Sequence, residues 1–135
     1  PRTQCVIGFA GKQRIETADF KFMVDTEFAV VVASSLTKAP LAESDRILIS
    51  TSGDARFTDI HMAEDFSNIE KTGQFPFLMQ PIEGQLVIKA DGNLEVYALD
   101  EAGQRLKKLE LKDSIEGKVL KLSAAHRAMH YEILR

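Results

Sequence analysis

The last fifty residues of the chain consist of short strand-like runs separated by turn signals, a spacing that few folds accommodate. Residues 85–89 run into Asp91-Gly92-Asn93, and residues 94–99 run into a second turn that ends at Gly103. Asp-Gly and Ala-Gly steps between runs of this kind are typical of hairpin turns. The pattern therefore predicts that these residues form hairpins of an antiparallel β-sandwich.

Alternating polarity continues through the rest of the chain. Phe20, Phe22 and Val24 alternate with more polar neighbours, as expected for a strand with one wet face. Residues 28–33 are apolar throughout, which predicts a central strand covered on both faces. Apolar residues recur at spacings of three and four within residues 60–70, so a short helix can form there. We expect an all-β antiparallel sandwich of about 8–10 strands, with at most one short helix near residues 60–70.

Length and composition indicate one globular domain. A chain of 135 residues, 44% of them hydrophobic, is about one domain long and can bury a core without disulfides. We therefore assign residues 1–135 to a single β-sandwich domain. The net charge is −3, and no basic stripe with interleaved aromatic residues is present, which argues against nucleic-acid binding. No apolar run approaches the roughly eighteen residues of a membrane span.

Cysteine and histidine residues give no support for a metal or cofactor site. The single cysteine, Cys5, cannot form an intrachain disulfide, and its strand-like surroundings predict a small buried hydrophobe. His126 and His130 are four residues apart and would share one side of a helix, but the expected third ligand is missing. On a strand the two would lie about 13 Å apart, too far to share a metal ion. We expect neither a metal nor a cofactor.

Motifs of known catalytic chemistry are also missing from the sequence. The chain has no G-x-S-x-G nucleophile elbow, no P-loop and no G-x-G-x-x-G. A glycosidase needs two carboxyl groups at a defined separation across a cleft. The acidic candidates here sit mostly near turns, where a solvated surface position is the usual explanation; they are Asp45, Asp54, Asp59, Glu64, Asp65 and Glu95. We expect no catalytic residue in this chain.

Four phenylalanines in the middle third are the candidates for a contact site: Phe57, Phe66, Phe75 and Phe77. The burial preference of phenylalanine favours buried packing for most of them, whereas exposure would make them a contact surface for a partner or a sugar. Sugar-binding modules usually present flat aromatic platforms, and this chain has no tryptophan and two tyrosines. An exposed patch of this kind suits protein better than sugar.

The order of several motifs resembles that of the carboxy-terminal β-sandwich of (β/α)-barrel glycoside hydrolases of the retaining clan A type. The similar stretches are Pro1-Arg2-Thr3-Gln4, Phe28-Ala29-Val30, Ser35-Leu36, Pro40-Leu41, Ser44–Ile49, Gly73, Pro76, Gln80–Gly84, Val96–Asp100 with Gly103, and His130–Ile133. The likeness covers nearly the whole chain, but the motifs are structural. Arg56-Phe57-Thr58-Asp59 departs from the Asn-Thr-Gly often found at that place, and the family's Trp before Gly is absent.

The resemblance implies a non-catalytic accessory domain, and on this basis we expect the chain to be a fragment of a longer glycoside hydrolase polypeptide. The catalytic glutamates of that family lie on a barrel of about 250 residues, which this chain is too short to contain. The implied partner is the catalytic barrel of the same polypeptide, and the implied location is periplasmic or extracellular. A carbohydrate-binding module that contacts polysaccharide and a protein-interaction sandwich are the alternatives.

Overall fold

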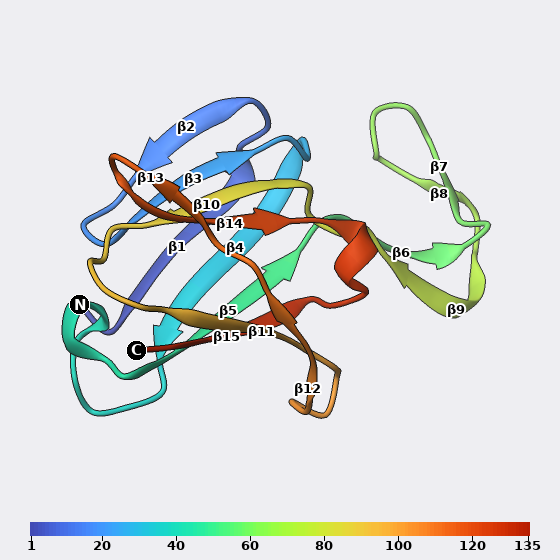
Figure 1. Cartoon of the computed structure of the whole chain (residues 1–135). Coiled ribbons are helices and arrows are strands. Elements are labelled where there is room, and N and C mark those ends of the chain that lie inside the picture. The colour runs from blue at the N-terminus through green and yellow to red at the C-terminus, as the bar shows by residue number, and fades with distance from the viewer.

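The computed structural model describes all of residues 1–135, and two antiparallel β-sheets form its body (Figure 1). The larger sheet has six strands in the order β1-β4-β5-β15-β11-β12. Their bounds are Thr3–Phe9 (β1), Phe28–Ser35 (β4), Arg46–Ser52 (β5), His130–Leu134 (β15), Glu95–Leu99 (β11) and Arg105–Leu109 (β12). The smaller sheet has the order β13-β14-β10-β3-β2, with bounds Lys112–Ser114, Gly117–Leu122, Gly84–Ile88, Phe20–Val24 and Gln13–Glu16. The predicted all-β antiparallel fold is confirmed.

Side chains from both sheets form one hydrophobic core between the two layers. In β3, Phe20, Phe22 and Val24 are buried, whereas the residues between them are partly exposed. Ile47 and Ile49 of β5 occupy the same core from the larger sheet. This alternation follows from the two-residue period of a strand, which turns one set of side chains towards the facing sheet.

Gly117 allows the tight hairpin between β13 and β14 to pack against the neighbouring strand. Ser114 pairs with Gly117, so the turn has two residues. The φ of Gly117 is +133°, a region in which side-chain-bearing residues are strained. A Cβ atom at this position would lie 2.1 Å from the carbonyl oxygen of Ile88. Only glycine therefore fits this approach of two backbones.

A protruding segment, here called the arm, comprises residues 54–80 between β5 and β10 (Figure 1). It contains β6 (Ala55–Thr58), β7 (His61–Met62), β8 (Ile69–Lys71) and β9 (Gln74–Met79), which pair as β6–β9 and β7–β8. At the base of the arm, Gly53 N–H donates to the Gln80 carbonyl over 3.0 Å, and Gln80 N–H donates to Asp54 over 2.8 Å. No residue of the arm is buried.

Helical structure is limited to two 3₁₀ turns, η1 (Leu41–Glu43) and η2 (Ala124–His126). Residues 60–70 contain β7 and the start of β8, so the short helix allowed by the sequence pattern does not form there. The structure has fifteen strands, above the expected 8–10, because the two sheets together contain eleven and the arm adds four short ones. The chain contains no helix that is both long enough and apolar enough to cross a membrane.

Some local expectations differ from the structure. The turn at Asp91-Gly92-Asn93 does not close a hairpin, because β10 pairs with β3 and β14 whereas β11 pairs with β12 and β15. This connection instead carries the chain from one sheet to the other. The second turn does close a hairpin, β11–β12, and Leu106 is an unpaired bulge residue within it.

The larger sheet is also less covered than the sequence suggested. Residues 28–33 lie in β4, whose even-numbered side chains are only partly buried, so one face of this strand lacks a covering layer. Cys5 is exposed on that same side of the sheet, contrary to the prediction of a buried thiol. The strand containing Cys5 was predicted, but the alternation of polarity there is too weak to tell the inner face from the outer one.

Candidate docking surface

The outer face of β1 and β4 presents a row of apolar side chains, here called the apolar ladder. Three pairs across the two strands form it: Cys5 opposite Val32, Ile7 opposite Val30, and Phe9 opposite Phe28. Ile7 is 65% exposed and Phe9 is 74% exposed. The rings of Phe9 and Phe28 meet edge to face with their centroids 5.5 Å apart. Cross-strand pairs of this kind hold the residues in a contiguous apolar strip.

The arm carries a second apolar group, built around Phe57. Its ring lies 5.4 Å from that of Phe75 and 5.2 Å from that of Phe77, both in edge-to-face geometry. All four candidate phenylalanines are exposed, at 40% for Phe57, 63% for Phe66, 82% for Phe75 and 51% for Phe77. The expectation that most of them would be buried is therefore wrong. The neighbouring Ile69, Leu78 and Met79 are exposed as well.

The apolar ladder and the arm border the same hollow, which has a volume of about 530 Å³. Phe9 and Phe28 line it from the sandwich, and Phe66 and Arg56 line it from the arm. The Arg56 guanidinium lies 5.8 Å from the centre of the Phe66 ring and also pairs with Asp54. Phe66 of the arm thus meets the apolar ladder at this hollow, whereas Phe57, Phe75 and Phe77 do not line it.

The other half of the outer face is charged and internally paired. The Glu132 carboxylate is 2% exposed and accepts hydrogen bonds from Arg46 and from Arg105, the latter over 2.6 Å. Burial opposes its ionisation, but the hydrogen bonds from Arg105 and Arg46 outweigh that cost and keep the pKa of Glu132 below its ordinary value. Arg105 also lies over the Tyr97 ring, 4.2 Å from its centre. Arg105 therefore covers this face of the Tyr97 ring.

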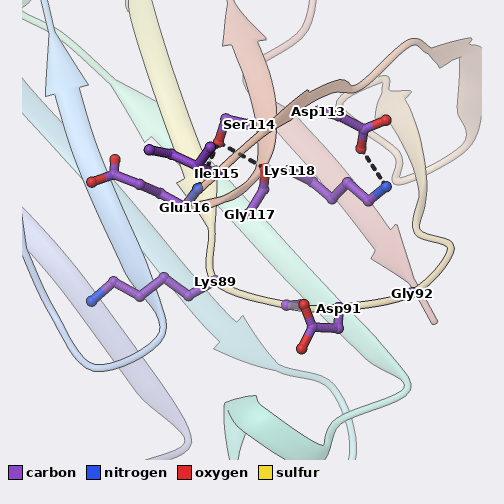
Figure 2. A pocket seen from close by; sticks show the side chains of 10 residues that line it. Lys89, Asp91, Gly92, Asp113, Ser114, Ile115, Glu116, Gly117 and Lys118 are labelled. Carbon is purple, nitrogen blue, oxygen red and sulfur yellow. Dashed lines mark hydrogen bonds and ion pairs between the residues drawn. The ribbon is translucent and has the colours of Figure 1, made fainter.

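A polar hollow of about 420 Å³ lies at the β13–β14 hairpin on the smaller sheet (Figure 2). Two of its three carboxylates, Glu116 and Asp113, pair with Lys21 over 2.6 Å and with Lys118 over 2.5 Å, respectively, whereas Asp91 has no ion-pair partner. The hydrogen bond from Lys21 lowers the pKa of Glu116. A glycosidase general acid needs a raised pKa. The lowered pKa of Glu116 therefore argues against such a role for this carboxyl group.

The histidines lie apart in different surroundings. The His126 ring in η2 meets Tyr131 edge to face at 5.8 Å, and burial lowers its pKa. His130 at the start of β15 shares a hydrogen bond of 3.1 Å with Ser50, and His61 lies in the arm. No group of three or more His, Cys, Asp or Glu side chains is placed to hold a metal ion.

Comparisons of the chain with protein-family models, with curated proteins and with solved structures give no match. The case for a function therefore depends on the surface itself and on the motif resemblance. Sequence reasoning selected the arm phenylalanines but missed Ile7 and Phe9. A signal for them exists in the two-residue spacing of Cys5, Ile7 and Phe9, which places the three side chains on one face of a strand but does not indicate whether that face is the inner or the outer one.

Proposed function

We propose that this chain is a non-catalytic β-sandwich that docks through the apolar ladder and the arm onto another folded domain. The observation that carries the proposal is that the exposed side chains of Ile7 and Phe9 and the partly exposed outer side chains of β4 form one strip, which meets the exposed Phe66 of the arm at a shared hollow. Exposed apolar patches of this kind on a soluble domain usually mark contacts with protein. The motif resemblance adds the nature of the partner: the catalytic (β/α) barrel of a glycoside hydrolase, carried by the same polypeptide.

The packing of the aromatic rings favours protein over polysaccharide as the partner. Phe75 and Phe77 stand at 89° and 78° to the ring of Phe57, so the cluster has no flat platform for a sugar ring. The exposed side chains that follow Phe77 in β9, Leu78 and Met79, suit irregular apolar contacts. Affinity electrophoresis against a panel of polysaccharides should therefore show no retardation of this chain, and retardation would favour the carbohydrate-binding alternative.

Cys5 provides a direct test of docking because it is the single cysteine and lies within the apolar ladder. The rate of maleimide labelling would be measured for residues 1–135 alone and for the full gene product that contains them. Both are kept dilute, so that association between copies does not contribute. A covering domain should slow labelling by at least about tenfold, since protection scales with the population of the open state.

A second cysteine position supplies the matched control. Ile115, at the β13–β14 turn, is fully exposed and lies on the other sheet. In a Cys5→Ser background, Ile115→Cys should label equally fast in the short chain and in the full gene product. Equal labelling rates for Cys5 in the two proteins would refute docking through the ladder. Glycosidase turnover that survives purification of residues 1–135 would refute the non-catalytic assignment.

A further inference from the structure

The free edge of β1 differs from the other three sheet edges of the sandwich. The edge strand β12 contains a bulge and three cationic residues, β13 has three residues, and β2 has four residues including Arg14 and Glu16. Bulges, charges and short length are the usual means by which proteins protect edges from pairing. β1 has seven residues, an unbroken register with β4, no proline and no charged side chain.

The pairing of β1 with β4 determines which backbone N–H and C=O groups of β1 point to its free edge. Ser35 N–H donates to the Arg2 carbonyl over 2.8 Å, and these two residues lie opposite each other in the continued register. Hydrogen-bonded and non-hydrogen-bonded pairs alternate along an antiparallel ladder. The N–H and C=O groups of Thr3, Cys5 and Ile7 therefore point away from β4, and they have no partner in the molecule. The edge is a ready template for another strand.

We propose that β1 of a second copy of this chain adds to this edge in antiparallel orientation, related by a two-fold axis at Val6. In this register Thr3 of one copy lies opposite Phe9 of the other, and Cys5 lies opposite Ile7. Both copies present the same outward backbone groups at Thr3, Cys5 and Ile7, as a two-fold interface requires. The Gln13 side chain, which donates to the Phe9 carbonyl over 2.9 Å, would give way to Thr3 of the other copy. Because the strand carries no charge, nothing in it repels its own copy, and it is the one uncharged strand among the four edge strands of the sandwich.

This inference rests on the backbone edge and not on the side chains that carry the proposed function. Strand addition would join the two larger sheets into one continuous sheet. The apolar ladders of the two copies would then form one strip on the same outer face, since paired residues point to the same side. Dimerisation would thus double the docking surface while leaving its side chains accessible.

A proline substitution separates backbone pairing from side-chain effects. Ile7→Pro removes an N–H that points to the free edge and leaves the β4 ladder intact, a position at which edge strands tolerate proline. Ile7→Thr removes a similar amount of apolar side chain but keeps the N–H. In sedimentation equilibrium, the wild-type chain and Ile7→Thr should dimerise, the latter within a few-fold of wild type. Ile7→Pro should weaken association by at least about tenfold with an unchanged circular dichroism spectrum.

Amide hydrogen exchange gives an independent readout with an internal control. The amides of Cys5 and Ile7 should become protected as the protein concentration rises, whereas those of Gln4 and Val6, which face β4, should be protected throughout. A chain that stays monomeric at all concentrations, or equal association of Ile7→Pro and Ile7→Thr, would overturn the proposal. Protection of Cys5 and Ile7 only in a longer gene product would also overturn it, because the added strand would then come from another segment. None of these results would alter the Cys5 labelling test of docking.

Discussion

At the scale of single residues, Glu132 is the buried charge on which the outer face of the larger sheet depends. Its carboxylate is 2% exposed, and both of its cationic partners remain partly in water. Glu132→Gln keeps the shape but leaves Arg46 and Arg105 without their ionised acceptor. We expect the free energy of unfolding at pH 7 to fall by about 2 kcal/mol, the typical value for hydrogen bonds to a charged group. Urea denaturation would measure the change.

The pH dependence of that loss identifies the ionised carboxylate as its source. The pKa of Glu132 is lower in the folded state than its ordinary value of 4.5. Its stabilisation is therefore fully present above that value and is lost as the pH falls through the folded-state pKa. The difference between wild type and Glu132→Gln should shrink below about pH 4.5. A difference that stays constant down to pH 2 would show that shape, and not charge, causes the loss. Glu95→Gln, at an exposed ion pair with Lys108, is the matched control and should have little effect.

Tyr131 gives the protein a second pH-dependent contribution to stability, at alkaline pH. Its side chain is 1% exposed in β15, and burial raises its pKa from 10.0 to about 12. The folded state thus holds the phenolic proton more tightly than the unfolded state does. Stability from this group is fully present below pH 10 and is lost as the pH rises towards 12. Two pKa units correspond to about 2–3 kcal/mol.

The corresponding variant is Tyr131→Phe, which removes the ionisable group but keeps the ring. Wild type should lose stability steeply between pH 10 and 12, and Tyr131→Phe should lose less over the same interval. Denaturation with urea across this range would compare the two proteins. Parallel pH profiles would contradict the raised pKa. Tyr97→Phe, at the partly exposed tyrosine beside Arg105, tests whether any tyrosine removal has the same effect.

At the scale of secondary-structure elements, the arm is separable from the sandwich. No residue of the arm is buried, and its base is closed by backbone hydrogen bonds between Gly53, Asp54 and Gln80. Replacing residues 55–79 by an Asn-Gly turn should keep the fold. The free energy of unfolding should change by less than about 1 kcal/mol, because few tertiary contacts are lost. Docking should weaken strongly in the Cys5 labelling assay. Loss of cooperative unfolding would mean that the arm is part of the folding unit.

The existence of most strands could be predicted from the sequence, but their partners could not. Alternation marked β3 correctly, because hydrophobic periodicity reports the face that a strand buries. The turn at Asp91-Gly92-Asn93 was recognised, yet it joins two sheets where a hairpin was expected. A turn motif specifies the local backbone and carries no information on which strand lies across the gap. Similarly, the spacing of Met62, Phe66 and Ile69 fits a helix, but short strands form there instead.

The exposed apolar surface of the ladder and the arm illustrates the same limit of sequence reasoning. Apolar side chains that face a partner have the same sequence pattern as side chains that face the core. Phe20 and Phe75 are indistinguishable by type, yet the first is fully buried and the second is 82% exposed. The clustering of phenylalanines in the middle third was a usable signal for the arm. The apolar ladder became visible only when the topology placed β1 at a sheet edge with an uncovered outer face.

At the scale of the whole molecule, one core shared by the two sheets should make them unfold together. Ile49 of the larger sheet and Leu86 of the smaller one are both fully buried in this core. Ile49→Ala and Leu86→Ala should each lower the free energy of unfolding by about 3 kcal/mol, through lost burial and the cavity left behind. Ile115→Ala, at a fully exposed turn, is the control and should have almost no effect.

Amide exchange in the same variants tests whether the coupling extends across the layers. Leu86→Ala should reduce protection equally in β10, its own strand, and in β4 and β5 of the opposite sheet, since the most protected amides of a cooperative unit exchange by global unfolding. The amides of the arm should exchange faster than those of the two sheets, and their exchange rates should be the same in Leu86→Ala as in the wild type. If Leu86→Ala lowered protection only in the smaller sheet, the layers would be separate folding units. The outer face of the larger sheet would then need a bound partner for its stability, instead of being held in place beforehand by the smaller sheet beneath it.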